Sequence, residues 1–237
     1  FVCACAKAVD HTAGWLVCRF SNDVIGVSDA ACAFARHLGA YSPIAIYNGI
    51  DVDWWRRPEG FTRNHVAPRI TFVGRLVHAK GVQDLFEALV PLLSEFPLLS
   101  VSIIGDGPYR VALGARAKEL GIADAIIFYG ALDSFGVRDI LWQSDLLINP
   151  SHSEGFPRSV LEAAAVGLPV IATNIGGTRE IIENEISGLL IPHNTITSTT
   201  MALRQLIAHK PLAARMARAA SIRVRDFSIE RMIAAYE

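Results

Sequence analysis

The sequence predicts an α/β protein in which a parallel sheet is covered by helices on both faces. From residue 69 onward, short apolar runs alternate with amphipathic stretches of helical length. The runs are almost continuously apolar, as expected of strands that are buried on both sides. Alternating strands and helices require right-handed crossovers, which make the strands parallel. Of the 237 residues, 51% are hydrophobic and 19% are charged, a composition that builds a packed core rather than a disordered chain.

The composition also narrows the function classes. The net charge of -1 gives no bulk attraction to DNA or RNA, so no nucleic-acid partner is expected. No apolar run approaches the roughly 20 residues that span a bilayer. The four cysteines, Cys3, Cys5, Cys18 and Cys32, have neither metal-site spacing nor a small disulfide scaffold around them. We expect buried free thiols in a reducing compartment, and hence a cytoplasmic protein.

The first 50 residues predict a small β-α-β unit. We expect a helix over residues 1–20, a strand over 23–27, and a helix that Ser28-Asp29 caps and Gly39 ends. A second strand covers 44–47. The chain starts at Phe1, and the unit resembles the tail of a domain whose front is absent.

Residues 51–68 have no clear periodicity and predict a linker or hinge. Within this segment, Trp54-Trp55 is expected to pack the linker against a domain; a sugar-stacking surface is the alternative. Apolar runs and amphipathic periodicity then give the remaining elements. Strands are predicted at 70–73, 99–104, 125–129, 146–148, 169–172 and 188–191. Helices are predicted at 82–96, 109–120, 137–143, 160–166, 177–183, 197–209, 211–223 and 228–236.

The turn after the strand at 70–73 has the features of a diphosphate site. It runs Gly74-Arg75-Leu76-Val77-His78-Ala79-Lys80-Gly81. Glycines let the backbone approach a ligand, and the next helix start presents free N–H groups. Arg75 can bind a phosphate through two hydrogen bonds, and Lys80 adds a point charge. The alternative is that Arg75 and Lys80 are only solvated surface cations beside a loop. We favour phosphate binding.

The stretch after the strand at 146–148 carries the acidic candidates. Here Glu154 precedes a helix and Glu162 lies two turns along it, so both carboxylates can reach one ligand. Carboxylates accept hydrogen bonds from sugar hydroxyls. The alternative makes Glu154 a surface residue, but Glu162 precedes Ala163-Ala164-Ala165 in a helix that should be buried, and a buried carboxylate needs a partner or a ligand.

Two more strand–helix loops are weaker candidates. Gly105 and Gly107 suggest a dinucleotide loop, but the third glycine is missing and Pro108 occupies the turn. In the last loop, Gly176-Gly177-Thr178 can offer backbone N–H groups to an anion, whereas Glu180 is as well explained by a helix cap.

Three further residues, and the possibility of a metal site, remain to be considered. Asp133 is a further candidate to which the sequence assigns no role, and Asp145 is expected to be a structural cap. His152 either donates to a phosphate or hydroxyl group of a ligand or has only a packing role within its loop. No metal constellation is present in the sequence.

Together these motifs resemble the retaining glycosyltransferases of family 4, which have the GT-B fold. The match rests on Gly74-Arg75-Leu76-x-x-x-Lys80-Gly81, on Ile104 to Pro108, on Glu154-Gly155-Phe156-Pro157 with Glu162 completing E-x7-E, and on Gly176 to Glu180. Val24 to Ser28 and Tyr47 to Asp51 resemble the family's segment before its hinge. The order and spacing of several motifs make the resemblance specific.

The resemblance implies roles for these residues. In the family, a Rossmann-like C-terminal domain binds a nucleotide-sugar donor. Arg75 and Lys80 would hold the diphosphate, Glu162 the ribose hydroxyls, and Glu154 would approach the donor sugar as the catalytic carboxylate. The donor site would also include Gly74, Gly105, Gly107, Gly155, Phe156, Pro157, Gly177 and Thr178. Neither a metal nor another cofactor is implied, and UDP is the expected nucleotide, with GDP and ADP open.

The resemblance also implies the domain order. Residues 1–50 would end an N-terminal acceptor domain, 51–68 form the hinge, 69–223 the donor domain, and 224–237 a helix that crosses back. A glycan or lipid-linked acceptor would bind the missing domain, and the full-length protein would associate peripherally with the cytoplasmic face of a membrane. A UDP-sugar 2-epimerase of GT-B type and a non-catalytic nucleotide-sugar-binding module are the alternatives.

Overall fold

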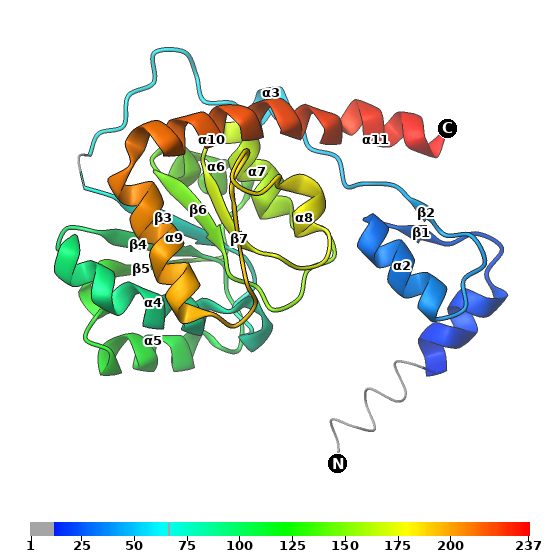
Figure 1. Cartoon of the computed structure of the whole chain (residues 1–237), viewed down its shortest axis with the longest axis horizontal. Helices are drawn as coiled ribbons and strands as arrows, with labels where there is room; N and C mark the ends of the chain where they lie inside the picture. The colour runs from blue at the N-terminus through cyan, green and yellow to red at the C-terminus, as the bar shows by residue number, and fades with distance from the viewer. Residues whose placement is uncertain (1–11, 66) are drawn as a thin grey trace.

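The computed structural model describes residues 12–65 and 67–237, which form a larger and a smaller unit (Figure 1). The larger unit contains a six-stranded sheet in the order β5-β4-β3-β6-β7-β8, and every neighbouring pair is parallel. The predicted fold class is confirmed. The strands are β3 (Arg69–Val73), β4 (Ser100–Ile104), β5 (Ile126–Gly130), β6 (Leu146–Asn149), β7 (Val170–Thr173) and β8 (Leu189–Ile191).

Helices follow the strands as the alternation predicted, with ends that differ by a few residues. They are α4 (Val82–Glu95), α5 (Arg110–Glu119), α6 (Ser134–Trp142), α7 (Arg158–Val166), α8 (Thr178–Ile181), α9 (Ile196–Ala208), α10 (Lys210–Arg223) and α11 (Ile229–Tyr236). Short 3-10 turns complete the unit: η1 (His78–Lys80), η2 (Ala123–Ala125) and η3 (Val224–Phe227).

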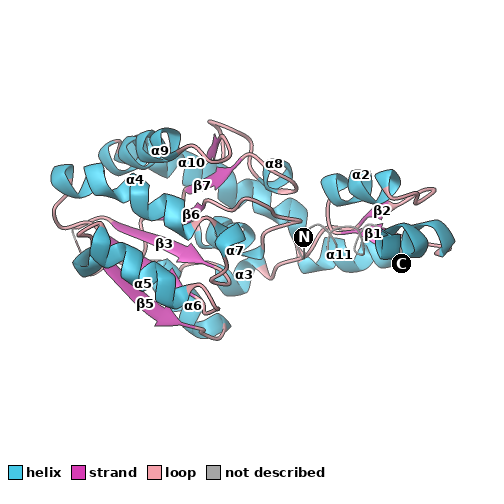
Figure 2. Ribbon diagram, turned by 90° about the horizontal axis from the view of Figure 1, so that it is seen from below, coloured by secondary structure: helices cyan, strands magenta, loops and turns pink. Residues whose placement is uncertain are grey.

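Helices cover both faces of this sheet (Figure 2), and an apolar core lies on each face. Side chains alternate along each strand, so Leu146 and Ile148 of β6 face one core while Leu147 faces the other. The first core contains residues from α4, α5 and α9, and the second contains residues from α6 and α7. Burial on both faces explains why the strands are apolar without interruption.

The smaller unit contains a helical stretch over residues 12–20, then β1 (Ile25–Gly26), α2 (Asp29–His37) and β2 (Ile44–Ala45). The predicted helix over 1–20 lies partly outside the described residues, as do Cys3 and Cys5; Cys18 and Cys32 are free thiols. As predicted, Ser28 caps α2, accepting a hydrogen bond from the Ala31 amide. The predicted strands were too long, because β1 and β2 pair only with each other over two residues.

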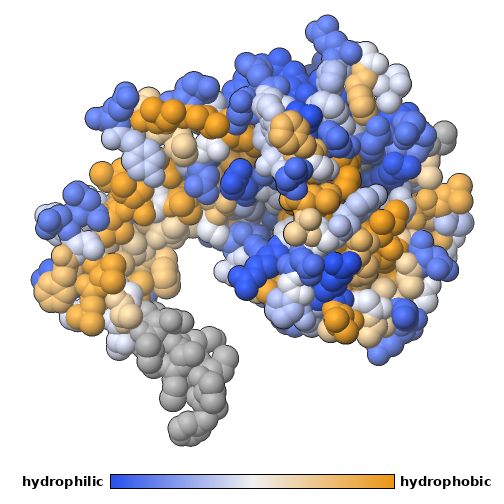
Figure 3. All heavy atoms as spheres, turned by 180° about the vertical axis from the view of Figure 1, so that it is seen from behind, coloured by the Kyte–Doolittle hydropathy of each residue, from blue (hydrophilic) through white to orange (hydrophobic). Residues whose placement is uncertain are grey.

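Apolar side chains gather on the surface of the smaller unit (Figure 3). Those at least half exposed are Leu16, Val17, Phe20, Phe34, Tyr41 and Ile44. Exposed apolar patches are typical of interaction sites for proteins, membranes or ligands.

The segment 51–68, which the sequence predicts to be a linker or hinge, contains the short helix α3 (Val52–Trp55). Asp51 caps this helix by accepting a hydrogen bond from the Trp54 amide at 3.0 Å. The Arg138 guanidinium lies 4.4 Å from the Trp54 ring centroid and 4.5 Å from that of Trp142. Trp55 is buried and its carbonyl accepts from the Trp142 indole at 3.0 Å. The tryptophan pair therefore packs the linker onto α6, as expected.

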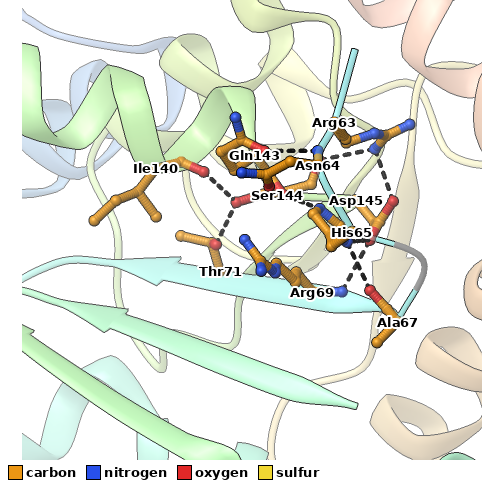
Figure 4. Close-up of polar contacts among 10 residues, drawn as sticks. All are labelled: Arg63, Asn64, His65, Ala67, Arg69, Thr71, Ile140, Gln143, Ser144 and Asp145. Carbon is orange, nitrogen blue, oxygen red and sulfur yellow. Dashed lines mark hydrogen bonds and ion pairs between the residues drawn. The ribbon is translucent and has the colours of Figure 1, made fainter. Parts of the chain in front are cut away.

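The second half of the linker is fixed at the amino ends of the strands (Figure 4). Arg63 forms an ion pair with Asp145 at 2.7 Å, and Asp145 accepts from the Arg69 amide at 2.9 Å. Both ring nitrogens of His65 lie against main-chain carbonyls, those of Ala67 and Gln143. Asp145 therefore has the structural role that the sequence predicted.

The last helix returns to the smaller unit. Ile50 donates its amide to the Phe227 carbonyl at 2.9 Å, and its own carbonyl accepts from the Ile229 amide at 3.2 Å. Figures 1 and 2 both show α11 running from the larger unit toward β1 and β2. Of the helices in the described chain, none has both the length and the apolar character needed to cross a bilayer.

Gly49 tests how closely α11 packs on this segment. A Cβ atom at Gly49 would lie 2.8 Å from the Ile229 Cα, so Gly49→Ala must displace α11. We expect the substitution to lower the free energy of unfolding by about 1–3 kcal/mol and to speed tryptic cleavage at Arg231. Thermal unfolding and timed proteolysis measure both effects.

The matched control is Gly114→Ala in the middle of α5, where an added Cβ meets nothing within 4 Å. Alanine is favoured over glycine in a helix, so this variant should be neutral or slightly more stable. If Gly49→Ala behaves like Gly114→Ala in both assays, α11 does not pack as described.

Candidate functional site

A cleft of about 450 Å³ opens at the carboxyl ends of β3 and β6, which are neighbours in the sheet. This edge is where ligands bind in open parallel sheets. The loops after both strands contribute, together with Trp55 from the linker and residues after β5. The predicted site residues that line the cleft are Gly74, Arg75, Lys80, Glu154, Phe156, Pro157 and Glu162.

The loop between β3 and α4 is held against its neighbours by main-chain contacts. The Gly74 amide donates to the Ile104 carbonyl at 3.0 Å, and the Leu76 amide donates to that of Asp106 at 2.9 Å. The loop ends at Gly81, whose φ of +68° is the left-handed conformation that glycine adopts readily. A Cβ there would lie 2.1 Å from the Pro150 carbonyl oxygen. Gly81 thus lets the lysine loop lie directly on the loop that carries Glu154.

Lys80 and Glu154 form an ion pair across the cleft. The Lys80 Nζ lies 2.6 Å from Glu154 Oε1, and the two side chains are 25% and 11% exposed. Ser151 Oγ donates to the same oxygen at 2.7 Å, and Asn149 Nδ2 lies 3.4 Å from it. These contacts fix the Glu154 carboxylate and compensate its charge. The sequence analysis assigned the two residues to different parts of a ligand and did not foresee this pair.

Arg75 differs from Lys80 in its environment. Its side chain is exposed, and no acidic residue in the described chain forms an ion pair with it. Its guanidinium is therefore available to an anion at the mouth of the cleft.

Glu162 lies on the second turn of α7 with its side chain 12% exposed. The nearest cation in the described chain is Arg158, 4.0 Å away and itself 69% exposed. Burial raises the pKa of the Glu162 carboxyl, and Arg158 opposes this only in part. The carboxylate is thus desolvated without full compensation, which is a signature of a ligand site.

The helix start beside Glu162 can also bind a ligand. Pro157 occupies the N-cap of α7 and no side chain caps this end. Pro157, Arg158 and Ser159 all line the cleft. Uncapped N–H groups and the helix dipole favour an anion at this position.

Phe156 connects the cleft to two distant segments. Its ring centroid lies 5.1 Å from that of Tyr47, which follows β2, and 5.3 Å from that of Phe227 in η3. Tyr47 and Phe227 are themselves 5.4 Å apart. Burial, with a hydrogen bond to Asp29, raises the pKa of the Tyr47 hydroxyl, so the phenol stays neutral. No motif in the sequence indicates this aromatic triangle.

The remaining predicted residues lie behind the cleft wall. They are Gly105, Gly107, Gly155, Gly177 and Thr178, and none lines the cleft. A Cβ at Gly105 would lie 1.9 Å from the Gly74 carbonyl oxygen, and one at Gly177 would lie 2.1 Å from that of Gly155. In the structure these two glycines allow adjacent loops to touch. Ligand contacts at the five residues stay a prediction.

Two weaker candidates, His152 and Glu180, contact other residues of the chain. His152 lies 2.5 Å from the Asp84 carboxylate, so its ring faces α4. Glu180 accepts hydrogen bonds from the Asp29 and Ala30 amides at 2.8 and 3.0 Å, and thereby caps helix α2 of the smaller unit. The alternative that the sequence suggested, a cap on the helix of its own loop, differs from this outcome, because the capped helix is α2.

The sequence analysis missed one wall of the cleft. Leu132, Ser134 and Val137, which follow β5, line it together with Trp55. Their ordinary residue types carry no motif, so only the strand order reveals them. Within residues 12–65 and 67–237, no group of His, Cys, Asp and Glu side chains is arranged to hold a metal ion.

Comparisons with known proteins agree with this architecture. The family profile described as glycosyl transferases group 1 matches residues 56–223. The glycogen synthase of Mycobacterium tuberculosis is 32% identical over 225 residues, covering 93% of this chain and 54% of that protein. A D-inositol 3-phosphate glycosyltransferase of Gordonia bronchialis is 33% identical over 182 residues, 70% of this chain and 39% of that protein. The chain thus spans about half the length of the curated relatives it matches, or less.

Solved structures share the fold. Anabaena HepE in complex with UDP-glucose superimposes with a TM-score of 0.85 at 22% identity, over 94% of this chain and 65% of that one. Sucrose-phosphate synthase from Thermosynechococcus elongatus superimposes with a TM-score of 0.86 at 21% identity, over 97% of this chain and 60% of that one. The sheet, the cleft and the profile match over most of the larger unit lead to one conclusion: this chain belongs to the group 1 glycosyltransferase family, and its fold is that of GT-B enzymes.

Proposed function

We propose that the cleft binds a nucleotide-diphosphate sugar and that the protein transfers the sugar to an acceptor with retention of anomeric configuration. The observation that carries this proposal is the convergence of Arg75, Lys80, Glu154 and Glu162, with the open start of α7, on one cleft. Two cations and free amides suit a diphosphate, and two carboxylates suit sugar hydroxyls.

Each side chain has a proposed task. Arg75 and Lys80 hold the diphosphate and stabilise the charge that develops on it as it leaves, in place of a metal ion. Glu162 accepts from the ribose hydroxyls. Glu154 faces the donor sugar, beside the backbone of Gly155, Phe156 and Pro157. Ser151, Asn149 and Lys80 all use its Oε1, which leaves Oε2 to accept from a sugar hydroxyl.

UDP is the nucleotide we propose. HepE is structurally similar to this chain and was solved with UDP and with UDP-glucose. Calorimetry against UDP, GDP and ADP, and then against their sugars, tests the choice.

Interconversion of a nucleotide sugar without an acceptor would instead favour the epimerase. Nucleotide affinity with unchanged cellular glycans after gene deletion would favour a non-catalytic module.

The smaller unit is proposed to be the end of an acceptor-binding domain. Its exposed apolar side chains and the greater length of the relatives support this. A glycan or lipid-linked acceptor would bind the remainder of that domain, at the cytoplasmic face of a membrane. The 237-residue chain alone is therefore expected to bind donor but to turn it over poorly or not at all, and fast transfer by this chain would contradict that expectation.

Removing either cation should weaken nucleotide binding. Arg75→Ala and Lys80→Ala each delete a charge-assisted hydrogen bond, which is worth about 1.5–3 kcal/mol, or roughly 10- to 100-fold in the UDP dissociation constant. The effect of Lys80→Ala includes the loss of its pair with Glu154. Calorimetry with UDP measures both variants.

Lys118→Ala is the control, because Lys118 is an exposed cation on α5 outside the cleft. Its UDP affinity should equal that of the unmodified chain. Unchanged affinity in both cleft variants would exclude the phosphate assignment.

Glu162 should make nucleotide binding depend on pH. Its pKa is raised in the empty site, and only the ionised form accepts from both ribose hydroxyls. Binding therefore favours ionisation, and UDP affinity should fall as the pH drops through this raised pKa. Glu162→Gln cannot titrate.

The measurement is the ratio of UDP dissociation constants, variant to unmodified chain, between about pH 5 and about pH 8. The ratio removes the titration of the nucleotide's own phosphate, which is common to both proteins. It should be large at the alkaline end and shrink toward the acid end. A ratio that stays constant would remove Glu162 from ribose binding.

A further inference from the structure

A second cavity, of about 480 Å³, lies at the opposite edge of the sheet. Residues at the amino ends of β3, β6 and β7 line it, as do one side of α9, one side of α10 and the end of the linker. The nucleotide cleft lies at the carboxyl edge, and the two cavities share no lining residue. Nothing in the proposed transferase chemistry uses this second cavity.

The cavity is strongly cationic. Five basic residues line it against one acidic residue, Asp145: they are Arg57, Arg63, Arg69, Lys210 and Arg218. Arg63 neutralises Asp145 at 2.7 Å. The other four side chains form no ion pair with a carboxylate of the described residues. Four cations without an ion-pair partner around one cavity attract an anion.

Arg57 is the residue that points most directly to a ligand. Its Nε and Nη2 atoms are buried and have no hydrogen-bond partner in the structure. Buried polar atoms are almost always hydrogen-bonded, and two buried guanidinium nitrogens without an acceptor are costly. Burial, followed by repulsion from Arg63, lowers the pKa of Arg57 to about 10. An anion in the cavity would supply the acceptor that these nitrogens lack.

The rest of the lining is apolar. Leu206 and Ile207 of α9, Ala214 and Ala217 of α10, and Leu168 before β7 form much of it. A small hydrated ion would leave this surface without a partner. A ligand with an apolar body attached to an anionic group would cover both parts.

The wall that carries the arginines is held in place. Figure 4 shows the linker segment at the amino end of β3, with Arg63 directed at Asp145 and His65 placed between two carbonyls. Thr71 and Ser144 add a buried hydrogen bond of 2.6 Å beside it. The cavity is thus bounded by an anchored linker on one side and by α9 and α10 on the other.

We propose that this cavity is a binding site for an amphiphilic organic anion, a phosphate monoester with an aliphatic or aromatic body. Arg57 and its neighbouring cations bind the phosphate, and α9 and α10 cover the apolar part. Such a group exists both in soluble metabolites and in anionic lipids.

Calorimetry with octyl phosphate, below the concentration at which it forms micelles, tests the proposal. We expect saturable binding of one molecule per chain. Octyl glucoside has the chain without the charge, and inorganic phosphate has the charge without the chain, so each should bind at least about tenfold more weakly. Equal binding of octyl phosphate and octyl glucoside, or no saturable binding, would overturn the proposal.

Two variants locate the binding. Arg57→Gln removes the guanidinium charge, and Ala214→Phe fills part of the cavity from the other wall while every cation is kept. Each should weaken octyl phosphate at least about tenfold. Arg225→Gln removes an exposed cation outside the cavity and should change nothing. Thermal unfolding shows whether each variant is folded, and full-strength binding by both folded cavity variants would refute the site.

Vesicles distinguish the two sources of the anion. If phosphatidylcholine vesicles that contain phosphatidic acid displace octyl phosphate, the natural ligand class is a membrane lipid. If they do not, it is a soluble amphiphile. Either result supports the site once octyl phosphate binding is established, and neither depends on whether the other cleft binds a nucleotide.

Discussion

The direct contact of main chain with main chain at the carboxyl edge of the sheet is the constraint on which the cleft depends. Four loops meet there, and at each junction a glycine lies where a Cβ would collide with a carbonyl oxygen of the next loop. The distances range from 1.9 Å at Gly105 and Gly176 to 2.1 Å at Gly81 and 2.3 Å at Gly107. Because backbone cannot yield as a flexible side chain can, these contacts fix the spacing of the loops. The charged side chains then reach one cleft.

This spacing explains the ion pair between Lys80 and Glu154. Gly81 lets the β3 loop lie on Pro150, so a lysine from one strand and a glutamate from the neighbouring strand approach to 2.6 Å. A partly buried pair costs desolvation, and extra hydrogen bonds from Ser151 and Asn149 offset part of that cost. The Glu154 carboxylate is therefore held in place, with its Oε1 atom occupied by hydrogen bonds. Glu162 has no such support, and burial raises its pKa.

The sequence was sufficient for what depends on periodicity and strand order. Alternating apolar runs gave the parallel sheet, and the turns after β3 and β6 meet because these strands are neighbours. It was not sufficient where two distant side chains decide the outcome. The helix within the linker depends on Asp51 and on Arg138 lying between two tryptophans, and Glu180 caps a helix 150 residues away. Leu132 and Val137 carry no motif, so their place in the cleft wall appears only in three dimensions.

The two units are joined through residues that also shape the cleft. Phe156 lies in the cleft wall and packs on Tyr47 and Phe227, while Glu180, close behind the same loops, holds the start of α2. Gly177 packs against both Gly155 and Ser28, so the junction includes main chain as well as side chains. A rotation of the smaller unit must therefore break these contacts or move the loop from Glu154 to Pro157 with it. Since that loop presents the carboxylate assigned to the donor sugar, the geometry of the cleft and the angle between the units are coupled by direct contact, with no intermediate chain of residues.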